Sequence, residues 1–435
     1  MGAHTTSGHI HIVGIGVAHK AQLSEAACRA ITHADKVIGS ARQLHTIDYL
    51  LSQCERTIST MQLPALSALG ELIDTLAGKI IVVLASGDPL YYGIGRWFAT
   101  HYPREQLSFY PAISSIQAAC HQLGIALQDV KVLSLHGRAL EKIRTQLRRE
   151  QYLVILTDKN SQPRQLAQEC IAAGFAQSQL TVCENLGYPQ QRIRTFSVAA
   201  LLDNADISVD PLHISILHVA GVGGVLPEFP GIPDAHYITG AQPGKGMITK
   251  REVRLVILSM MQPTNNDVIW DVGAGCGGVA IELAYWNERV TVYAIEQHAK
   301  RREYISANRE RFGVGDNLHV IAARAPAALN GLPAPTKIFI GGSDGELDTL
   351  LTYAWQRLPD QGVLVVSAVT ASSKAQLSVF AQHMAVEQQA DIESTTVAIT
   401  RGSIASGQAS GFVYQTKKPV EIFKLTKHNT ERKSK

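Results

Sequence analysis

A glycine-rich stretch in the second half of the chain constrains the fold more than any other feature. Residues 269–282 read Ile-Trp-Asp-Val-Gly-Ala-Gly-Cys-Gly-Gly-Val-Ala-Ile-Glu. The pattern predicts a buried strand over Val268–Val272 that breaks at Gly273 and turns into a helix through Gly275 and Gly277. The first N–H groups of such a helix point at a ligand, so we expect these three glycines to bind a cofactor.

Two acidic residues narrow the choice of cofactor. Gly273, Gly275 and Gly278 also satisfy the dinucleotide pattern G-x-G-x-x-G, so NAD is an alternative. Glu296 ends the next apolar run and can accept hydrogen bonds from the ribose of either NAD or S-adenosylmethionine. Asp271 distinguishes these two cofactors. A carboxylate attracts the cationic amino-acid group of S-adenosylmethionine and repels the pyrophosphate of NAD. We therefore expect S-adenosylmethionine at this loop.

The length of 435 residues exceeds what one hydrophobic core usually serves, so we expect more than one domain. Residues 221–240 hold five glycines and three prolines, a composition typical of a linker. We place domains at 1–222 and 241–418, a linker at 223–240 and a basic tail at 419–435.

Composition limits the partners and the compartment. No apolar run is long enough to cross a bilayer, and the six cysteines form no C-x-x-C pair, so we expect a cytoplasmic protein without a membrane partner. The net charge is +3, but residues 417–435 alone carry seven Lys or Arg against two Glu. The rest of the chain is therefore close to neutral, and we expect no nucleic-acid partner. We also expect a homo-oligomer.

Apolar runs alternate with helix-like segments in both halves, as in an α/β protein. Lys79–Ala85 reads as a buried parallel strand, and the loop behind it carries Asp88 and Tyr91, where a ligand is expected. Three closely spaced runs after residue 179 predict antiparallel pairing in a second lobe. In the second half, Thr249 is a candidate cap for a helix over Lys250–Met261.

The end of the second half predicts how its sheet closes. Thr395–Thr400 and Gly411–Thr416 read as two strands around a Gly/Ser-rich loop. A hairpin of these two strands would complete a seven-stranded sheet with one antiparallel edge.

The first half resembles the tetrapyrrole methylases, a two-lobed α/β family. The resemblance rests on Val-Gly-Ile-Gly at 13–16, Ser-Gly-Asp-Pro at 86–89, Ile-Ser-Ser at 113–115, and Ser-Leu-His-Gly-Arg at 134–138. It implies that S-adenosylmethionine binds in the cleft between the lobes. The cofactor residues that it implies there are Val17, Asp88, Tyr91, Ser114, Ser115 and Thr157.

The second half resembles the decarboxylating methyltransferases of corrin synthesis, which act together with the tetrapyrrole methylases that modify late precorrins. The resemblance rests on Ile-Thr-Lys-Arg-Glu-Val-Arg at 248–254, the glycine-rich stretch and Ile-Phe-Ile-Gly-Gly at 338–342. It implies a Rossmann-like class I domain with a second S-adenosylmethionine site that includes Thr249 and Ala323. Together the two resemblances imply methylation of carbons 5 and 15 of precorrin-6B and loss of a ring acetate carboxyl to give precorrin-8X.

Such a substrate carries many carboxylates, so each site should offer Arg and Lys donors. The substrate-binding candidates are Arg138, Lys250, Arg251, Arg254 and Arg401. No nucleophile or acid–base residue is required, and His136, Arg138 and Arg254 are the only catalytic candidates. Nothing in the sequence calls for a metal.

Three alternatives stay open on the sequence alone. The second domain could serve an NAD-dependent oxidoreductase. The chain could be a non-catalytic module that binds S-adenosylmethionine. The chemistry could also act on cobalt-containing precorrins, because the metal state of the macrocycle leaves no mark on the sequence.

Overall fold

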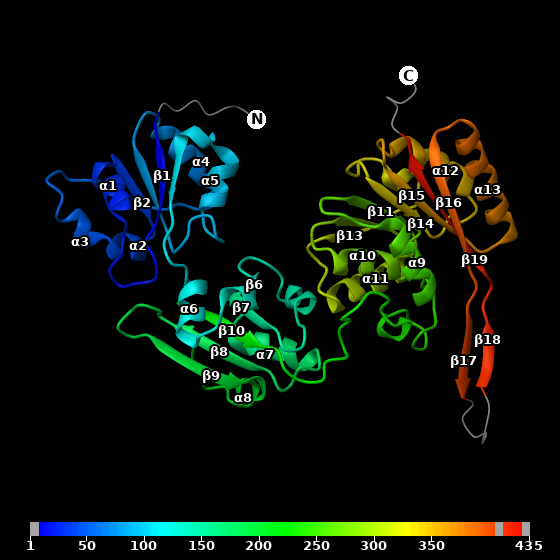
Figure 1. Cartoon of the computed structure of the whole chain (residues 1–435), viewed down its shortest axis with the longest axis horizontal. Helices are drawn as coiled ribbons and strands as arrows, with labels where there is room; N and C mark the ends of the chain where they lie inside the picture. Colours follow the sequence, from blue (N-terminus) through cyan, green and yellow to red (C-terminus); the bar gives the residue numbers. More distant parts are fainter. Residues whose placement is uncertain (1–7, 405–411, 429–435) are drawn as a thin grey trace. The chain divides into compact units, whose positions relative to one another are not determined.

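The computed structural model describes residues 8–404 and 412–428. The chain divides into two compact units that meet in sequence between Gly223 and Gly224, with residues 141–146 grouped with the second unit (Figure 1). No helix in the described ranges combines the length and apolarity needed to cross a membrane. The α/β class predicted from alternating apolar runs is confirmed in both units.

The first unit begins with a lobe built on five parallel strands in the order β3-β2-β4-β1-β5. The central strand, β4, is buried along its whole length, as the unbroken apolar run predicted. The elements of this lobe are β1 (Ile10–Gly14), α1 (Glu25–His33), β2 (Lys36–Gly39), α2 (Ala41–Thr46), α3 (Asp48–Leu51), β3 (Ser59–Gln62), α4 (Leu66–Thr75), β4 (Ile81–Ala85), α5 (Gly95–His101) and β5 (Leu107–Tyr110).

The second lobe of this unit is a sheet in the order β6-β7-β10-β8-β9. Only β6 and β7 are parallel, and the three later strands pair antiparallel, which confirms the prediction from their close spacing. The elements are α6 (Ser115–Leu123), β6 (Val130–Ser134), β7 (Tyr152–Leu156), α7 (Pro163–Ala172), β8 (Gln179–Glu184), β9 (Arg192–Ser197), α8 (Val198–Asp203) and β10 (His213–His218).

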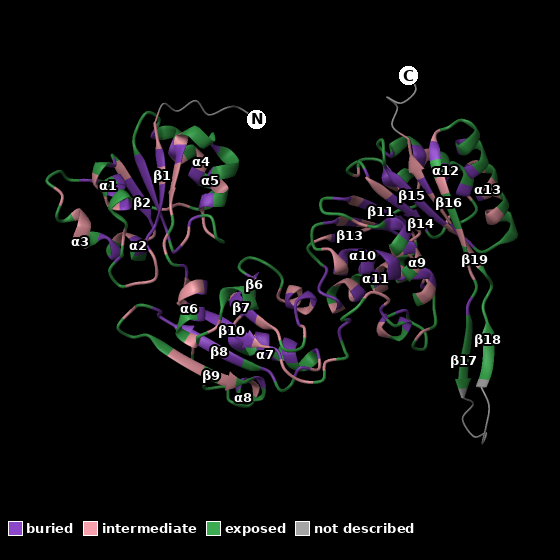
Figure 2. Ribbon diagram, viewed as in Figure 1, coloured by how far each residue is buried: buried purple, intermediate pink, exposed green. Residues whose placement is uncertain are grey.

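The second unit is a seven-stranded sheet in the order β13-β12-β11-β14-β15-β19-β16. Helices cover both faces of the buried strands (Figure 2). Successive residues of one strand therefore enter different cores: Ile269 packs with α9 and α10, and Trp270 packs with α12 and α13. The elements are α9 (Arg251–Met261), β11 (Val268–Val272), α10 (Gly278–Trp286), β12 (Thr291–Ile295), α11 (Ala299–Arg311), β13 (Leu318–Ile321), β14 (Lys337–Ile340), α12 (Leu347–Arg357), β15 (Val363–Ala368), α13 (Ala371–Val386), β16 (Ala390–Val397) and β19 (Val420–Lys427).

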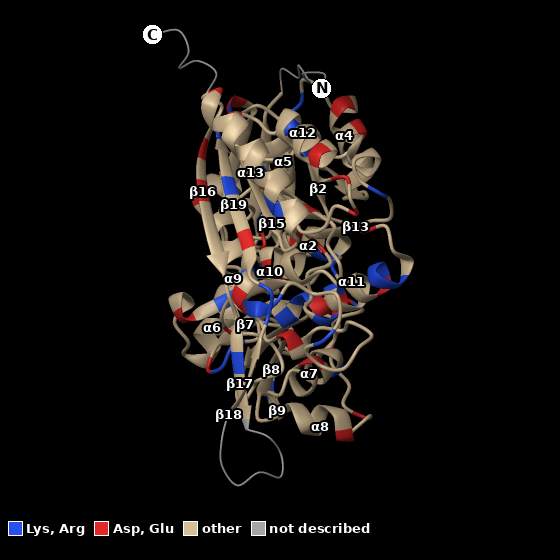
Figure 3. Cartoon of the chain, turned by 90° about the vertical axis from the view of Figure 1, so that its right-hand side faces the viewer, with Lys and Arg blue, Asp and Glu red and all other residues tan. Residues whose placement is uncertain are grey.

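The seven strands confirm the predicted sheet, but the prediction is wrong for one of the two strands that close it. The strand inserted antiparallel beside β15 is β19, which lies in the segment predicted to be a basic tail, 419–435. Ile422 and Leu425 are fully buried, and Lys427 donates to the carbonyls of Trp355 and Leu358 at 2.9 and 2.7 Å. Charged residues alternate with the apolar ones along β19 and concealed its apolar face: Glu421 pairs with Lys374, and Lys424 pairs with Glu393 (Figure 3).

Of the two strands expected to close the sheet, Thr395–Thr400 overlaps the end of β16, which does form the edge of the sheet, whereas Gly411–Thr416 overlaps a strand of a separate two-stranded hairpin. This hairpin consists of β17 (Thr400–Ile404) and β18 (Phe412–Thr416) and extends beyond the sheet (Figure 1). The loop between them and the last seven residues of the expected tail lie outside the described residues.

The segment 223–240 was predicted to be a linker, but its second half is packed into the second unit. Ile232 and Tyr237 belong to the core of the second unit, where they are 0% and 4% exposed. The glycines and prolines around them do form turns, but the two apolar side chains anchor the segment. Residues 231–239 are therefore part of the second unit.

Candidate functional site

A cavity of about 160 Å³ lies at the carboxyl ends of the parallel strands of the second unit. Four of the predicted cofactor residues line it: Gly273, Gly275, Glu296 and Ala323. Its other lining residues include Met247 before α9, Arg301 in α11, and Gln297, Arg324 and Asp344 in the loops after β12, β13 and β14. This is the place where an open parallel sheet offers a ligand site.

Two of the glycines in the wall of the cavity, Gly273 and Gly275, cannot be replaced without strain. Gly273 and Gly275 have φ values of +73° and +60°. A Cβ on Gly273 would lie 2.5 Å from the carbonyl oxygen of Gly342, and one on Gly275 would lie 2.6 Å from that of Met247. The loop is thus a closely packed backbone surface, as expected for a cofactor that contacts main chain.

Glu296 presents a fixed carboxylate to the cavity. Its Oε2 accepts from the N–H of Gly275 at 2.9 Å, its Oε1 accepts from the N–H of His298 at 2.9 Å, and Arg301 Nη1 lies 3.7 Å from Oε1. Each carboxylate oxygen has a second lone pair, so the group can still accept from two hydroxyls. This arrangement suits the two hydroxyls of a ribose.

Asp271 does not line the cavity. Its carboxylate is buried, and Oδ2 accepts from the N–H of Ala280 in α10 at 3.0 Å. Burial raises its pKa to about 7. Its Oδ1 is a buried oxygen without a hydrogen-bond partner among the described residues.

Two other predicted cofactor residues lie behind the cavity wall. Gly277 is the N-cap residue of α10 with φ +85°, and a Cβ there would lie 3.3 Å from Ile305. Thr249 does not cap α9, which begins after Lys250 without a side-chain cap from its own chain neighbours. The capping prediction for Thr249 is therefore wrong.

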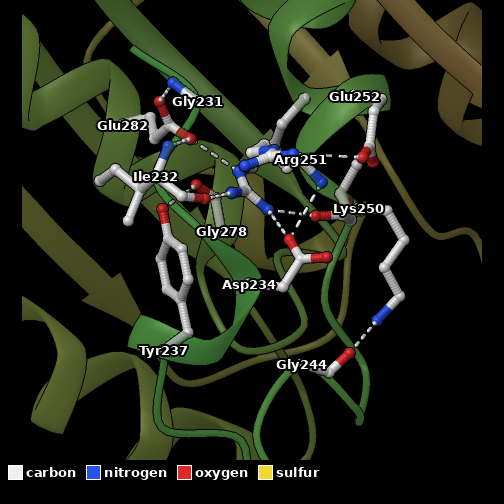
Figure 4. A network of polar contacts seen from close by, with 12 residues as sticks. Gly231, Ile232, Asp234, Tyr237, Gly244, Lys250, Arg251, Glu252, Gly278 and Glu282 are labelled. Carbon is white, nitrogen blue, oxygen red and sulfur yellow. Dashed lines mark hydrogen bonds and ion pairs between the residues drawn. The ribbon is translucent and has the colours of Figure 1, made fainter. Parts of the chain in front are cut away.

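Two of the four cationic candidates of the second unit, Arg254 and Arg401, pair with one buried carboxylate, Asp234, and the backbone N–H of Arg251 donates to it. Figure 4 shows the network around Asp234. Asp234 Oδ1 accepts from Arg254 Nη1 and from the N–H of Arg251, both at 2.9 Å, and Oδ2 accepts from Arg401 Nη2 at 3.2 Å. Lys250 donates to the carbonyl of Gly244 at 3.0 Å. The sequence predicted the cations but not Asp234, because it lies in the segment interpreted as a linker.

Arg254 is not available to a substrate, which overturns its prediction as a substrate-binding or catalytic residue. Its side chain is 0% exposed, and its Nε donates to Glu282 at 2.8 Å. Its remaining nitrogens donate to Asp234 and to the carbonyls of Thr249 and Ile232. A buried arginine with this set of partners is a structural group.

Arg401, Arg251 and Lys250 remain accessible. The Arg401 side chain is 43% exposed and also pairs with Glu252 at 2.6 Å. Burial, and then the nearby charges of Arg401 and Lys417, lower the pKa of Lys250, although Asp234 opposes them. Lys417, two residues before the expected tail, is a further cation that was not among the predicted candidates.

In the first unit the predicted cofactor loops meet at the carboxyl ends of β1 and β4. A Cβ on Gly87 would lie 2.6 Å from the Cα of Ser114, so the two loops touch. Asp88 Oδ1 accepts from the N–H of Leu90 at 2.8 Å, which leaves Oδ2 open, and the Tyr91 side chain is exposed. Ser114 caps α6 by accepting from the N–H of Gln117 at 3.2 Å, and Ser115 is the first residue of that helix.

The remaining candidates of the first unit lie on the second lobe or face it. Thr157 directly follows β7 in the sequence, and its Oγ1 lies 3.1 Å from His213 Nε2. His136 and Arg138 are exposed in the loop after β6, and Arg138 donates to the carbonyl of Ser134 at 3.3 Å. Val17 packs against the core of the second lobe. These residues lie at the carboxyl ends of β6, β7 and β1.

Two family matches define the class of protein to which this chain belongs. The family described as tetrapyrrole (corrin/porphyrin) methylases matches residues 9–202, and the family described as precorrin methyltransferase domain matches residues 242–427. The chain is thus a methyltransferase with two methylase units. The oxidoreductase and non-catalytic alternatives find no support in these matches.

Three relatives indicate which family of methyltransferases the chain belongs to. The precorrin-6Y C(5,15)-methyltransferase (decarboxylating) of Sinorhizobium sp is 35% identical over 84% of this chain and 86% of its own length. The cobalt-precorrin-7 C(5)-methyltransferase of Salmonella typhimurium is 35% identical over 47% of this chain and 96% of its own. The probable cobalt-precorrin-6B C(15)-methyltransferase (decarboxylating) of Methanothermobacter thermautotrophicus is 34% identical over 44% and 94%. The chain belongs to the precorrin-6Y C5,15-methyltransferase (decarboxylating) family.

Proposed function

We propose that this enzyme methylates carbons 5 and 15 of precorrin-6B and removes the carboxyl group of a ring acetate to give precorrin-8X. The observation that carries the proposal is the presence of two separate methylase units in one chain, each matched by its own family. The two shorter relatives support the division, since one is named for carbon 5 and the other for carbon 15 with decarboxylation.

S-adenosylmethionine is the proposed cofactor at two sites, and it supplies an electrophilic methyl group on a sulfonium when bound. In the second unit, Glu296 and the backbone of Gly273 and Gly275 would hold the ribose and the amino-acid part. The unpaired Oδ1 of Asp271, one residue before the cavity wall, suits a cationic group. In the first unit, Asp88, Tyr91, Ser114, Ser115, Thr157 and Val17 remain the predicted ligands.

The substrate site of the second unit is proposed at the accessible cations next to the cavity. Arg401 and Arg251 can each form two parallel hydrogen bonds with a carboxylate, whereas Lys250 acts as a point charge. Lys250 is three residues from Met247, which lines the cavity. A tetrapyrrole held by its acetate and propionate groups would therefore lie within reach of the cofactor.

Methyl transfer to a reduced tetrapyrrole needs alignment more than acid–base catalysis, because the enamine-like ring carbon is itself the nucleophile. Holding the reacting atoms about 3 Å apart makes the step effectively unimolecular. Loss of carbon dioxide leaves electron density on the macrocycle, and a closed pocket protects it from stray protonation. We assign the decarboxylation and the carbon 15 methylation to the second unit and the carbon 5 methylation to the first.

The same chemistry on a cobalt-containing precorrin is a second candidate, favoured by the names of the two shorter relatives. Parallel assays with metal-free and cobalt-containing substrate decide between them. The enzyme is expected to convert the metal-free form at the higher kcat/KM, as the full-length relatives are named for precorrin-6Y.

The direct test of the proposal is the mass change of precorrin-6B incubated with the full chain and S-adenosylmethionine. The product is expected to gain two methyl groups and lose one carbon dioxide. Calorimetry on the same protein should find two sites for S-adenosylhomocysteine and none for NADH. A single site, or a product without methyl gain, would overturn the proposal.

A further inference from the structure

Residues 231–239, which we call the strap, lie outside the matched range 242–427 but are bound into the second unit. Glu282 accepts from the N–H groups of Gly231 and Ile232 at 2.8 and 3.0 Å. At the other end of the strap, Asn308 accepts from the N–H of Ile238 at 2.8 Å and donates to its carbonyl at 2.9 Å. The strap is thereby tied to α10 and to α11.

Asp234, at the centre of the strap, supplies what the start of α9 lacks. The N-cap residue Lys250 gives no side-chain cap, yet the first helical N–H, that of Arg251, donates to Asp234 Oδ1 at 2.9 Å. A carboxylate at a helix N-terminus is stabilised by the N–H groups and the helix dipole. Asp234 therefore caps α9 from a distant part of the sequence and neutralises the buried Arg254 at the same time (Figure 4).

The start of α9 is connected to the cofactor cavity by a short segment. Met247 lines the cavity, and its carbonyl accepts from the N–H of Cys276 in the glycine loop at 3.0 Å. Fixing Arg251 thus limits where Met247 can lie. A second link runs from the strap to the same loop, because the hydroxyl of Tyr237 donates to the carbonyl of Gly278 at 3.4 Å.

Asp234 also reaches the proposed substrate side. Its Oδ2 accepts from Arg401 at the start of the β17–β18 hairpin. One carboxylate therefore contacts both the helix that precedes the glycine loop and a cation of the proposed substrate site. The side chain of Asp234 is only 4% exposed, so it cannot itself take part in the reaction as a substrate ligand.

We propose that Asp234 is a positioning residue of the second methylation site, which holds Met247 against the glycine loop through α9 and holds Arg401 beside it. This inference rests on the proposed cofactor site in the second unit. It assigns a role in the second methylation site to the strap, which lies outside the family match over residues 242–427.

The test uses the full chain with Asp234→Asn, which keeps the size of the side chain and removes its charge. Calorimetry at a temperature where all variants are folded, as judged by circular dichroism, measures S-adenosylhomocysteine at both sites. The second site should bind about tenfold more weakly, equivalent to about 1.4 kcal/mol, with the first site unchanged as an internal control. Tyr237→Phe, which barely disturbs packing, should weaken the second site about two- to threefold.

The matched control is Asp267→Asn, at the opposite end of β11. Asp267 is also a buried carboxylate, which accepts from Thr264 and Thr336 and pairs with Lys337 at 3.4 Å. It should lower thermal stability but leave both affinities unchanged. The inference fails if Asp234→Asn and Tyr237→Phe keep wild-type affinity, or if Asp267→Asn weakens the second site equally. Failure of the proposed function looks different, since the wild type would then lack the second site altogether.

Discussion

Oδ1 of Asp234 lies 2.9 Å from Nη1 of Arg254, and their side chains are 4% and 0% exposed. Arg254 has a second buried partner, Glu282, at 2.8 Å. Removing one partner from a buried ion pair costs about 3–5 kcal/mol because it leaves an uncompensated charge. The segment that carries Asp234 is therefore required for the stability of the second unit.

Fragments test this requirement. A fragment of residues 224–435 should unfold cooperatively, because it retains the strap. A fragment of residues 242–435, which keeps the whole family match but lacks Asp234, should be less stable by about 3–5 kcal/mol or fail to fold. Urea unfolding followed by circular dichroism measures the difference. Equal midpoints for the two fragments would show that the strap is dispensable.

Changing Glu296 should separate the two cofactor sites. Glu296→Ala removes a charged acceptor for ribose hydroxyls and should weaken binding of S-adenosylhomocysteine at the second site by about 1.5–3 kcal/mol. Asp88→Ala should have a comparable effect on the first site only. Calorimetry on the full chain reports both sites together. A change that affects the two sites equally would contradict the assignment of loops to sites.

Arg401→Ala and Lys250→Ala should each raise KM for the tetrapyrrole about three- to tenfold, because each removes one carboxylate partner at an accessible position. Affinity for S-adenosylhomocysteine should change little. Arg357→Ala is the control, since Arg357 is an exposed cation on α12 that lies over the ring of Tyr353. Steady-state kinetics decide the point, and an unchanged KM in both variants would remove these residues from the substrate site.

The glycine loop could be predicted from the sequence because its determinants are local. Strand, glycines and helix follow one another, and Glu296 ends the adjacent strand at a spacing typical of such folds. The Asp234 network could not be predicted, since its members are distant in sequence: Arg254 lies 20 positions from Asp234 and 28 from Glu282. The position of an arginine in the sequence does not show whether its side chain is exposed to solvent or buried among hydrogen-bonding partners.

The end of the chain was misinterpreted for a related reason. Val420–Lys427 carries charges at positions that reach solvent or donate to carbonyls, so its composition resembled a tail. Its burial depends on β15 and β16, which pair with it on both sides. Pairing of this kind is a tertiary property that composition does not reveal.

The stability of the second unit should depend on the ionisation of Asp271. Its pKa is raised from 3.8 to about 7 by burial, so the folded state retains a proton that the unfolded state has lost between these values. Stability should therefore fall as pH rises through this window. Asp271→Asn stays neutral and should gain on the order of 4 kcal/mol over the wild type at pH 8, but not near pH 4.

Urea unfolding at several pH values measures this difference. Asp267→Asn serves as the comparison, because hydrogen bonds from Thr264 and Thr336 and the charge of Lys337 outweigh burial and lower the pKa of Asp267. The advantage of Asp271→Asn should grow with pH. An advantage that is constant with pH would show that Asp271 does not titrate in this range.

We assign decarboxylation and one methylation to the second unit. Mass spectrometry of the products that Asp88→Ala and Glu296→Ala form from precorrin-6B labelled in the ring acetate carboxyl tests this assignment. At an S-adenosylmethionine concentration below the wild-type Kd, Asp88→Ala should release labelled carbon dioxide and add one methyl group, whereas Glu296→Ala should release carbon dioxide about ten- to hundredfold more slowly. Release of carbon dioxide by Glu296→Ala at the wild-type rate together with its loss in Asp88→Ala would contradict the account.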